Sequence, residues 1–205
     1  MKPILKRSIV VFLLAAILGL VVVDKWGSSS QTVYGDIDRN GNQEEYLLKN
    51  QQLQVFENNH LIWHTPGEWQ VNQIRLADAD NNEQTELLLV IWKKGSFGKS
   101  KPFWFKGPDD KYTCHLFLYR LLSGRMKEVW CSSALVNPII KLDVKDTDAD
   151  GLNELNVREG PQTGFAYPLR KLFSHQNTTW IWNGWGFTRK SWKQGDVLFA
   201  SFTGS

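Results

Sequence analysis

Asp146-Thr-Asp-Ala-Asp-Gly-Leu-Asn-Glu154 places carboxylates at positions 1, 3, 5 and 9 of a nine-residue loop, with glycine at position 6. Alternate acidic side chains on a tight turn direct their oxygens towards one point, and Ca²⁺ takes six to eight oxygen ligands. The glycine permits the sharp turn, so that a main-chain carbonyl can add a ligand. Position 12 is Val157, whereas an EF-hand needs Glu there. We therefore predict a calcium loop of another kind, with Asp146, Asp148, Asp150, the carbonyl of Leu152 and Glu154 as ligands.

The same frame occurs twice upstream. The first copy, Asp36-Ile-Asp-Arg-Asn-Gly-Asn-Gln-Glu44, keeps the glycine, whereas the second, Asp78-Ala-Asp-Asn-Asn-Glu-Gln-Thr-Glu86, has Glu83 in its place. The predicted calcium ligands are Asp36, Asp38, Asn40 and Glu44 in the first copy and Asp78, Asp80, Asn82 and Glu86 in the second. One acidic loop is usually a solvated turn, but three in one register indicate a repeated structural unit. We expect the loop at Asp146 to bind Ca²⁺ most tightly and the loop at Asp78 most weakly.

The apolar residues of residues 31–192 fall in short runs bounded by Gly, Asn and Asp, which is typical of β-strands. Each acidic loop is expected to join the first and second of four strands. The expected strands are Val33–Ile37, Glu45–Lys49, Leu53–Glu57, Leu61–His64, Val71–Leu76, Leu87–Trp92, Cys114–Leu122, Met126–Cys131, Ile139–Val144, Leu155–Arg158, Thr179–Asn183 and Gly186–Trp192. The predicted fold class is therefore all-β.

Four antiparallel strands, repeated, are the unit of a β-propeller blade. The three loops resemble those of FG-GAP or VCBS-type repeats, the calcium-binding blades of integrin-α-like propellers. The resemblance implies blades at about 31–66, 69–133 and 137–192, structural Ca²⁺, and a role in extracellular adhesion or ligand binding rather than catalysis. Propellers typically have four to eight blades. Three blades imply a small or open array, an additional strand from Gly195–Phe202, or a homo-oligomer that completes the ring.

The N-terminal segment is expected to lie outside this repeat. Met1–Arg7 carries three basic residues and Ser8–Val23 carries no charge. We interpret residues 1–26 as a signal anchor that crosses the cell membrane once through residues 8–23. Residues 27–30 would be a linker, and residues 31–205 would be the extracytoplasmic body. A cleaved signal peptide, and hence a secreted protein, is the alternative.

The charge distribution argues against a nucleic-acid partner. The formal net charge is +3, and three of the basic residues precede the apolar segment. Acidic and basic residues are therefore balanced in the rest of the chain, so the hypothesis of a nucleic-acid partner loses its main support.

Two long connections indicate where a partner would bind. The first residues of the acidic loops are 42 and then 68 residues apart, and the additional residues lie mainly in Lys93–Pro108. Gly160–Arg170 lengthens the third unit at the same place, and both insertions should emerge at the end opposite the acidic loops. Loops that a rigid scaffold presents often carry function. The candidate ligand-binding residues are Phe103, Trp104, Phe105, Phe165 and Tyr167. The alternative is that these loops are packing cover between blades.

The chain is rich in tryptophan, with ten in 205 residues. Alternation along a strand places Trp180 and Trp182 on one face, where we expect them to pack between blades. Cys114 and Cys131 are the only cysteines. They would oppose each other if the hairpin between them turned at Leu121–Gly124, and a disulfide would then be reasonable outside the cytoplasm. The alternative is two small core residues.

Three functional hypotheses follow. The preferred one is a membrane-anchored, non-catalytic binding or adhesion module with structural Ca²⁺ and a protein or glycan ligand at the cell surface. The second is a carbohydrate-binding module that uses the aromatic residues near Trp104. The third is a glycosidase-like enzyme, which would need two carboxylates on either side of the scissile bond. The sequence favours the first because many of the acidic residues lie in the three loops, and Asp109-Asp110, Glu68 and Asp196 cannot be paired from the sequence.

Overall fold

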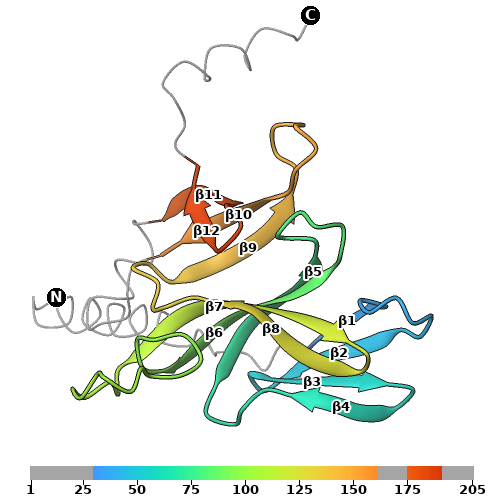
Figure 1. The fold of residues 1–205 in the computed structure, drawn as a ribbon, viewed down its shortest axis with the longest axis horizontal. Helices are drawn as coiled ribbons and strands as arrows, with labels where there is room; N and C mark the ends of the chain where they lie inside the picture. Colours follow the sequence, from blue (N-terminus) through green and yellow to red (C-terminus); the bar gives the residue numbers. More distant parts are fainter. Residues whose placement is uncertain (1–29, 161–174, 191–205) are drawn as a thin grey trace, which may run out of the picture.

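The computed structural model describes residues 30–160 and 175–190, which fold into three four-stranded antiparallel sheets (Figure 1). The first sheet contains β1 (Gln31–Gly35), β2 (Glu44–Lys49), β3 (Gln52–Glu57) and β4 (His60–His64). The second contains β5 (Gln70–Ala77), β6 (Glu86–Lys94), β7 (Tyr112–Leu122) and β8 (Arg125–Cys131). The third contains β9 (Ile139–Lys145), β10 (Glu154–Glu159), β11 (Gln176–Trp182) and β12 (Phe187–Arg189).

Strand order within each sheet follows chain order, so each sheet is a meander of neighbouring hairpins. Each of the twelve expected segments overlaps one of these strands, and each acidic loop joins the first strand of a sheet to the second. The all-β class and the division into three four-stranded units are confirmed. The first strand of the second sheet, β5, contacts the first strands of the other two sheets, β1 and β9.

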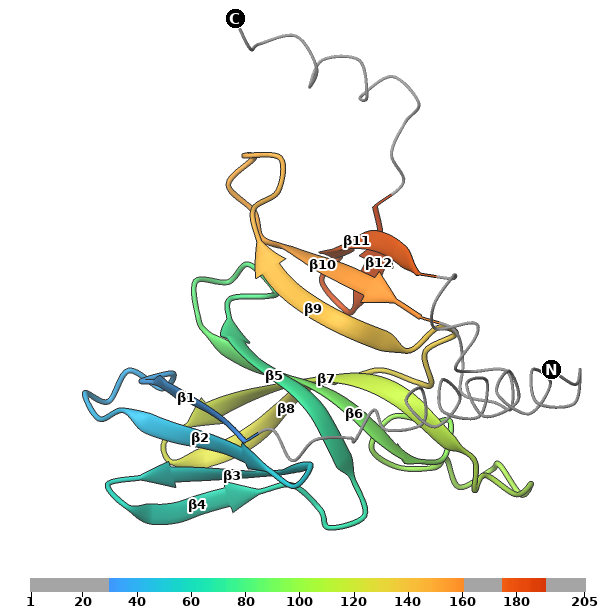
Figure 2. The same cartoon turned by 180° about the vertical axis from the view of Figure 1, so that it is seen from behind.

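The second sheet lies between the other two and is covered on both faces (Figure 2). Alternation along β6 sends Leu87, Leu89 and Ile91 into one apolar cluster with the first sheet, and Leu88 and Val90 into another with the third. All five side chains are fully buried. The uninterrupted apolar run of β6 is therefore the signature of a strand that is covered on both faces.

The two tryptophans of β11 occupy the predicted face. Trp180 is buried in the cluster between the second and third sheets, and Trp182 packs against that cluster. Trp182 meets Trp130 of β8 edge to face, with ring centroids 6.3 Å apart. The prediction that Trp180 and Trp182 pack between units is therefore confirmed.

The predicted disulfide does not form, and both cysteines are free thiols. The β7–β8 hairpin turns at Ser123-Gly124, whose backbones have φ of 50° and 70°, and not over the four residues from Leu121 to Gly124. This two-residue turn and a bulge in β8 place Cys131 opposite Phe117. Cys114 faces the cluster shared with the third sheet, whereas Cys131 packs on the cluster shared with the first. The two thiols therefore lie on opposite faces of one sheet.

Several predictions concern residues outside those that the structure describes. They are the anchor and linker within residues 1–29, the ligand candidates Phe165 and Tyr167, and the additional strand at Gly195–Phe202. Within residues 30–160 and 175–190, no helix is long and apolar enough to cross a membrane.

Candidate metal centres

The three acidic loops share one backbone scaffold. In each loop the Asp at position 1 accepts a hydrogen bond from the backbone N–H of position 6, at 2.8–2.9 Å. The Glu at position 9 accepts another from the N–H of position 2, at 2.8–3.0 Å. The residue at position 6 has positive φ in each loop: 89° at Gly41, 67° at Glu83 and 87° at Gly151. Glu83 therefore keeps the loop shape in a conformation that favours glycine.

This scaffold brings three carboxylates together in each loop. The groups are formed by positions 1, 3 and 9, and in each group the ligand oxygens lie within 4.8 Å of one another. The groups are Asp36, Asp38 and Glu44; Asp78, Asp80 and Glu86; and Asp146, Asp148 and Glu154. The position-9 glutamate begins the second strand and is buried in all three groups. Three carboxylates at this separation repel one another, and either a nearby positive charge or a bound proton relieves that repulsion.

The second loop contains a cation from its own sheet. Arg120 of β7 donates to Asp80 Oδ2 at 3.1 Å and to Glu86 Oε1 at 2.7 Å. The Glu86 side chain is fully buried and the Asp80 side chain is 9% exposed. Burial raises the pKa of Glu86 and of Asp80, and the contact with Arg120 opposes that rise. The guanidinium thus lies where a cation bound to this loop would lie.

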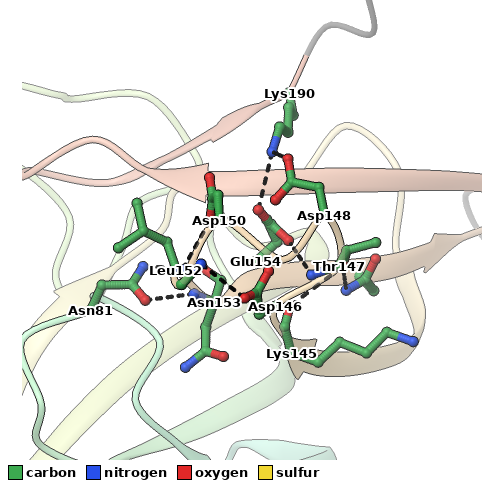
Figure 3. Close-up of polar contacts among 12 residues, drawn as sticks. Asn81, Lys145, Asp146, Thr147, Asp148, Asp150, Leu152, Asn153, Glu154 and Lys190 are labelled. Atoms are coloured by element: carbon green, nitrogen blue, oxygen red, sulfur yellow. Dashed lines mark hydrogen bonds and ion pairs between the residues drawn. The ribbon is translucent and has the colours of Figure 1, made fainter. Parts of the chain in front are cut away.

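The third loop has the same arrangement with a different residue. Lys190, just after β12, reaches across the sheet to Asp148 and to Glu154 Oε1, the latter at 3.1 Å (Figure 3). Its hydrogen bond to Asp148 holds the pKa of that carboxyl below its ordinary value. The loop is tied to the second loop through Asn81, whose Oδ1 accepts from Asn153 N–H at 2.6 Å. This loop too contains a cation from within the chain, which pairs with two of its carboxylates.

The first loop differs from both. Among the described residues, no Lys or Arg forms an ion pair with Asp36, Asp38 or Glu44. Glu44 is fully buried; its Oε2 accepts from Ile37 N–H at 3.0 Å and from the Tyr46 hydroxyl at 3.2 Å. Its Oε1 has no hydrogen-bond partner. Burial raises the pKa of Glu44, and the nearby Asp38 and Asp36 raise it further.

A further carboxylate adjoins the first loop. Glu57, the last residue of β3, lies opposite Glu44 in the sheet. It accepts from Asn40 Nδ2 at 2.6 Å, which links it to the loop. Glu57, Arg120 and Lys190 were not identified from the sequence. The sequence could have predicted the position of Glu57, because in an antiparallel hairpin the last residue of the third strand lies opposite the first residue of the second.

The side chains at position 5 accept hydrogen bonds from the backbone in all three loops. The Oδ1 atoms of Asn40, Asn82 and Asp150 accept from the N–H of position 7, at 2.7–2.9 Å. They therefore shape the loop, and the compact carboxylate groups are built by positions 1, 3 and 9. The expected carbonyl ligand at Leu152 stays a prediction, and its side chain is 52% exposed.

The aromatic insertion is the other predicted site. Phe103 and Trp104 are 84% and 69% exposed, whereas Phe105 is 37% exposed and contacts Phe97. The β6–β7 connection that carries them leaves the second sheet at the end opposite the acidic loops, as predicted (Figure 2). The structure thus separates the two predicted sites, with carboxylates at one end and aromatic residues at the other.

Comparisons with protein-family models, with curated proteins and with solved structures found no match to this chain.

Proposed function

We propose that the chain is a membrane-anchored, non-catalytic binding module outside the cytoplasm, with Ca²⁺ bound in the Asp36 loop. The observation that carries the proposal is Glu44, a fully buried carboxylate with an unpartnered Oε1 in a group of three acids. An unpaired charge in such a place is costly, and a bound cation removes the cost. Carboxylate oxygens are the ligands that Ca²⁺ prefers.

This proposal changes the order of affinity expected from the sequence. Loop composition favoured the site at Asp146, but Lys190 is already ion-paired to Asp148 and Glu154 there. Arg120 holds the equivalent place in the second loop. We therefore expect one Ca²⁺ per chain rather than three. Its dissociation constant should be on the order of 10⁻⁴–10⁻³ M, as in extracellular modules.

The propeller-like arrangement is part of the same proposal. Strand order follows chain order in all three sheets. An acidic loop joins the first two strands of each, and the first strand of the second sheet contacts the first strands of the other two. These features support the resemblance to FG-GAP or VCBS-type blades, in which calcium in this loop fixes the inner hairpin of a blade. Calcium then has a structural role here, and the partner binds elsewhere.

The partner would bind at the end opposite the acidic loops, where Phe103 and Trp104 are exposed. A protein or glycan ligand there corresponds to the adhesion hypothesis. Catalysis is less well supported, because two of the buried carboxylates are engaged in ion pairs: Glu86 with Arg120 and Glu159 with Arg189. The anchor is supported by the charge-free run at residues 8–23, and secretion after cleavage is the alternative.

The calcium site is tested by calorimetry on the full chain in detergent micelles. One ion should bind, and Glu44→Gln should abolish binding. Glu154→Gln, the same change at the equivalent position of the third loop, is the matched control and should leave the stoichiometry unchanged. With a dissociation constant of about 1 mM, about 10 mM Ca²⁺ should stabilise the fold by about 1.4 kcal/mol. No binding at several millimolar Ca²⁺, or binding that survives Glu44→Gln, would remove the basis of the proposal.

A further inference from the structure

The β6–β7 connection has a rigid base. Gly95 N–H donates to Lys111 O at 2.9 Å, which closes the connection where the strands end. Asp109 Oδ1 accepts from the Ser96 N–H at 2.8 Å and from the Ser96 hydroxyl at 2.9 Å. Ala134 N–H donates to Ser96 O at 2.8 Å and fixes this base to the segment after β8. The connection is therefore held in place at the sheet and presents its tip outward.

In the tip, residues 99–106, one aromatic side chain is packed and two are exposed to solvent. Phe105 N–H donates to Pro102 O at 3.1 Å, which forms a tight turn. The Phe105 ring lies 5.0 Å from the Phe97 ring and 5.1 Å from the Lys101 ammonium. Phe105 thus provides the internal contact of the tip, while Phe103 and Trp104 are 84% and 69% exposed.

The shape and charge of the tip indicate its partner. Phe103 and Trp104 meet at an interplanar angle of 85°, so their two rings form a wedge. Lys99, Lys101 and Lys106 are exposed around them, and residues 99–106 contain no acidic residue. Aromatic side chains are favoured at the membrane–water interface, and lysines are attracted to anionic headgroups.

The position of the tip brings it towards a membrane. Gln31 begins β1 at the end of the first sheet opposite its acidic loop, and the β6–β7 connection leaves the second sheet at the corresponding end. Only residues 24–30 separate Gln31 from the charge-free segment Ser8–Val23. Seven extended residues span at most about 25 Å. An anchored chain would therefore hold this end of the body close to the lipid surface.

We propose that residues 99–106 dock on the membrane in which the chain is anchored, at anionic lipids of the extracytoplasmic leaflet that faces the body. Phe103 and Trp104 enter the interfacial layer, and Lys106 contacts the headgroups, because Lys99 forms an ion pair with Glu128 and Lys101 donates to Gly107 O. The inference rests on the membrane anchor of the proposed function, and it assigns the aromatic tip to the lipid surface in place of a protein or glycan ligand. It also explains why two large aromatic side chains are held in solvent by a rigid base.

Depth-dependent quenching tests this docking. The full chain is reconstituted in nanodiscs of phosphatidylcholine with phosphatidylglycerol, with brominated acyl chains to quench tryptophan, and in nanodiscs of phosphatidylcholine alone. Trp104→Phe should remove a quenched component of the emission. Trp185→Phe is the matched control, because Trp185 is 78% exposed on the β11–β12 turn, and it should leave the quenched component unchanged. Lys106→Gln should lower the ratio of docked to undocked tip about fivefold in anionic discs, since one lysine near such a surface contributes that much.

The outcomes separate this inference from the proposed function. A chain that enters nanodiscs but shows no quenching of Trp104 overturns the docking alone. A chain that does not enter nanodiscs overturns both the proposed anchor and the proposed docking. The calcium site is tested separately, by calorimetry. Quenching of Trp104 that is equal in anionic and neutral discs overturns the role of Lys106. A soluble glycan or acidic peptide that shifts Trp104 emission, without quenching by lipid, assigns the tip to a different partner.

Discussion

Replacing Arg120 with methionine should convert the second acidic loop from a loop with an internal cation into a calcium site. Methionine keeps much of the length and volume of the side chain but removes its charge. The guanidinium leaves Glu86 Oε1 and Asp80 Oδ2, from which it lies 2.7 and 3.1 Å away. The loop backbone should persist, because Asp78 and Glu86 still accept from Glu83 N–H and Ala79 N–H.

The expected loss of stability follows from the burial of the two carboxylates. The Glu86 side chain is fully buried and the Asp80 side chain is 9% exposed. Removal of one partner of a buried ion pair costs about 3–5 kcal/mol, because the remaining charge is left uncompensated. If the vacated loop binds Ca²⁺ with a dissociation constant of about 10⁻⁴ M, then about 10 mM Ca²⁺ restores about 2.7 kcal/mol. Most of the loss should therefore be reversed by calcium.

Thermal unfolding of the full chain in micelles measures both effects. For a chain of this size, about 1 kcal/mol shifts the melting temperature by about 2–4 °C. The variant in EGTA should melt about 10 °C below wild type, and Ca²⁺ should recover more than half of that difference. Calorimetry should show two ions per chain in place of one. Arg75→Met is the control, because Arg75 is also half-buried but contacts the carbonyl of Ile74.

The reasoning would be refuted by a variant that is destabilised, is not recovered by Ca²⁺, and binds no additional ion. Arg120 would then support the sheet without substituting for a metal. Binding of three Ca²⁺ ions by the wild-type protein would also refute the reasoning, because it would show that Arg120 and Lys190 do not exclude calcium from their loops.

Three further predictions concern single groups. Glu83→Gly should raise the free energy of unfolding by about 1 kcal/mol, because φ of 67° is unfavourable for Glu, and a thermal melt that shows destabilisation would contradict this. Lys190→Met should add a calcium site in the third loop with a smaller loss of stability than Arg120→Met, since the Lys190 side chain is 26% exposed; calorimetry showing unchanged stoichiometry would exclude it. Cys114 and Cys131 should not form a disulfide when the folded protein is exposed to an oxidant, because they face different clusters. Mass spectrometry after alkylation in denaturant should then find two modified thiols.

Local features of the sequence predicted the strands and the acidic loops. Apolar runs between Gly, Asn and Asp mark the strands, and the loop frame recurs where the first strand of each sheet meets the second. The cations could not be found in this way. Arg120 lies 34 residues after Glu86, and Lys190 lies 36 residues after Glu154. Their approach depends on strand register and on the path of the chain after β12, which no local pattern specifies.

Register also explains the error at the cysteines. The position of a hairpin turn sets which residues oppose each other, and a shift of one residue exchanges the two faces of a strand. Ser123-Gly124 forms a shorter turn than the sequence interpretation assumed, and the bulge in β8 adds one residue. Cys131 therefore moved from opposite Cys114 to opposite Phe117. A pairing inferred from spacing alone is sensitive to both features.

Completion of a ring by further copies of the chain is opposed by the surface of the third sheet. Such a ring would place the outer face of the first sheet, with Tyr34 60% and Leu61 49% exposed, on the outer face of the third. There Lys141 of β9 lies directly opposite Arg158 of β10, and both are exposed. Burial of these two like charges against apolar residues would cost several kcal/mol per ion. The contacts that join the three sheets, in contrast, bury apolar side chains.

We therefore expect the array to remain open and the chain to be a single copy in micelles. Native mass spectrometry should find one chain per particle, with and without Ca²⁺, because calcium binds within one loop and not between copies. The variant Lys141→Leu with Arg158→Leu removes the two charges and should associate more readily than wild type. A stable wild-type assembly of several chains, weakened by Leu61→Lys, would instead show that the outer faces do meet and that the ring is completed between copies.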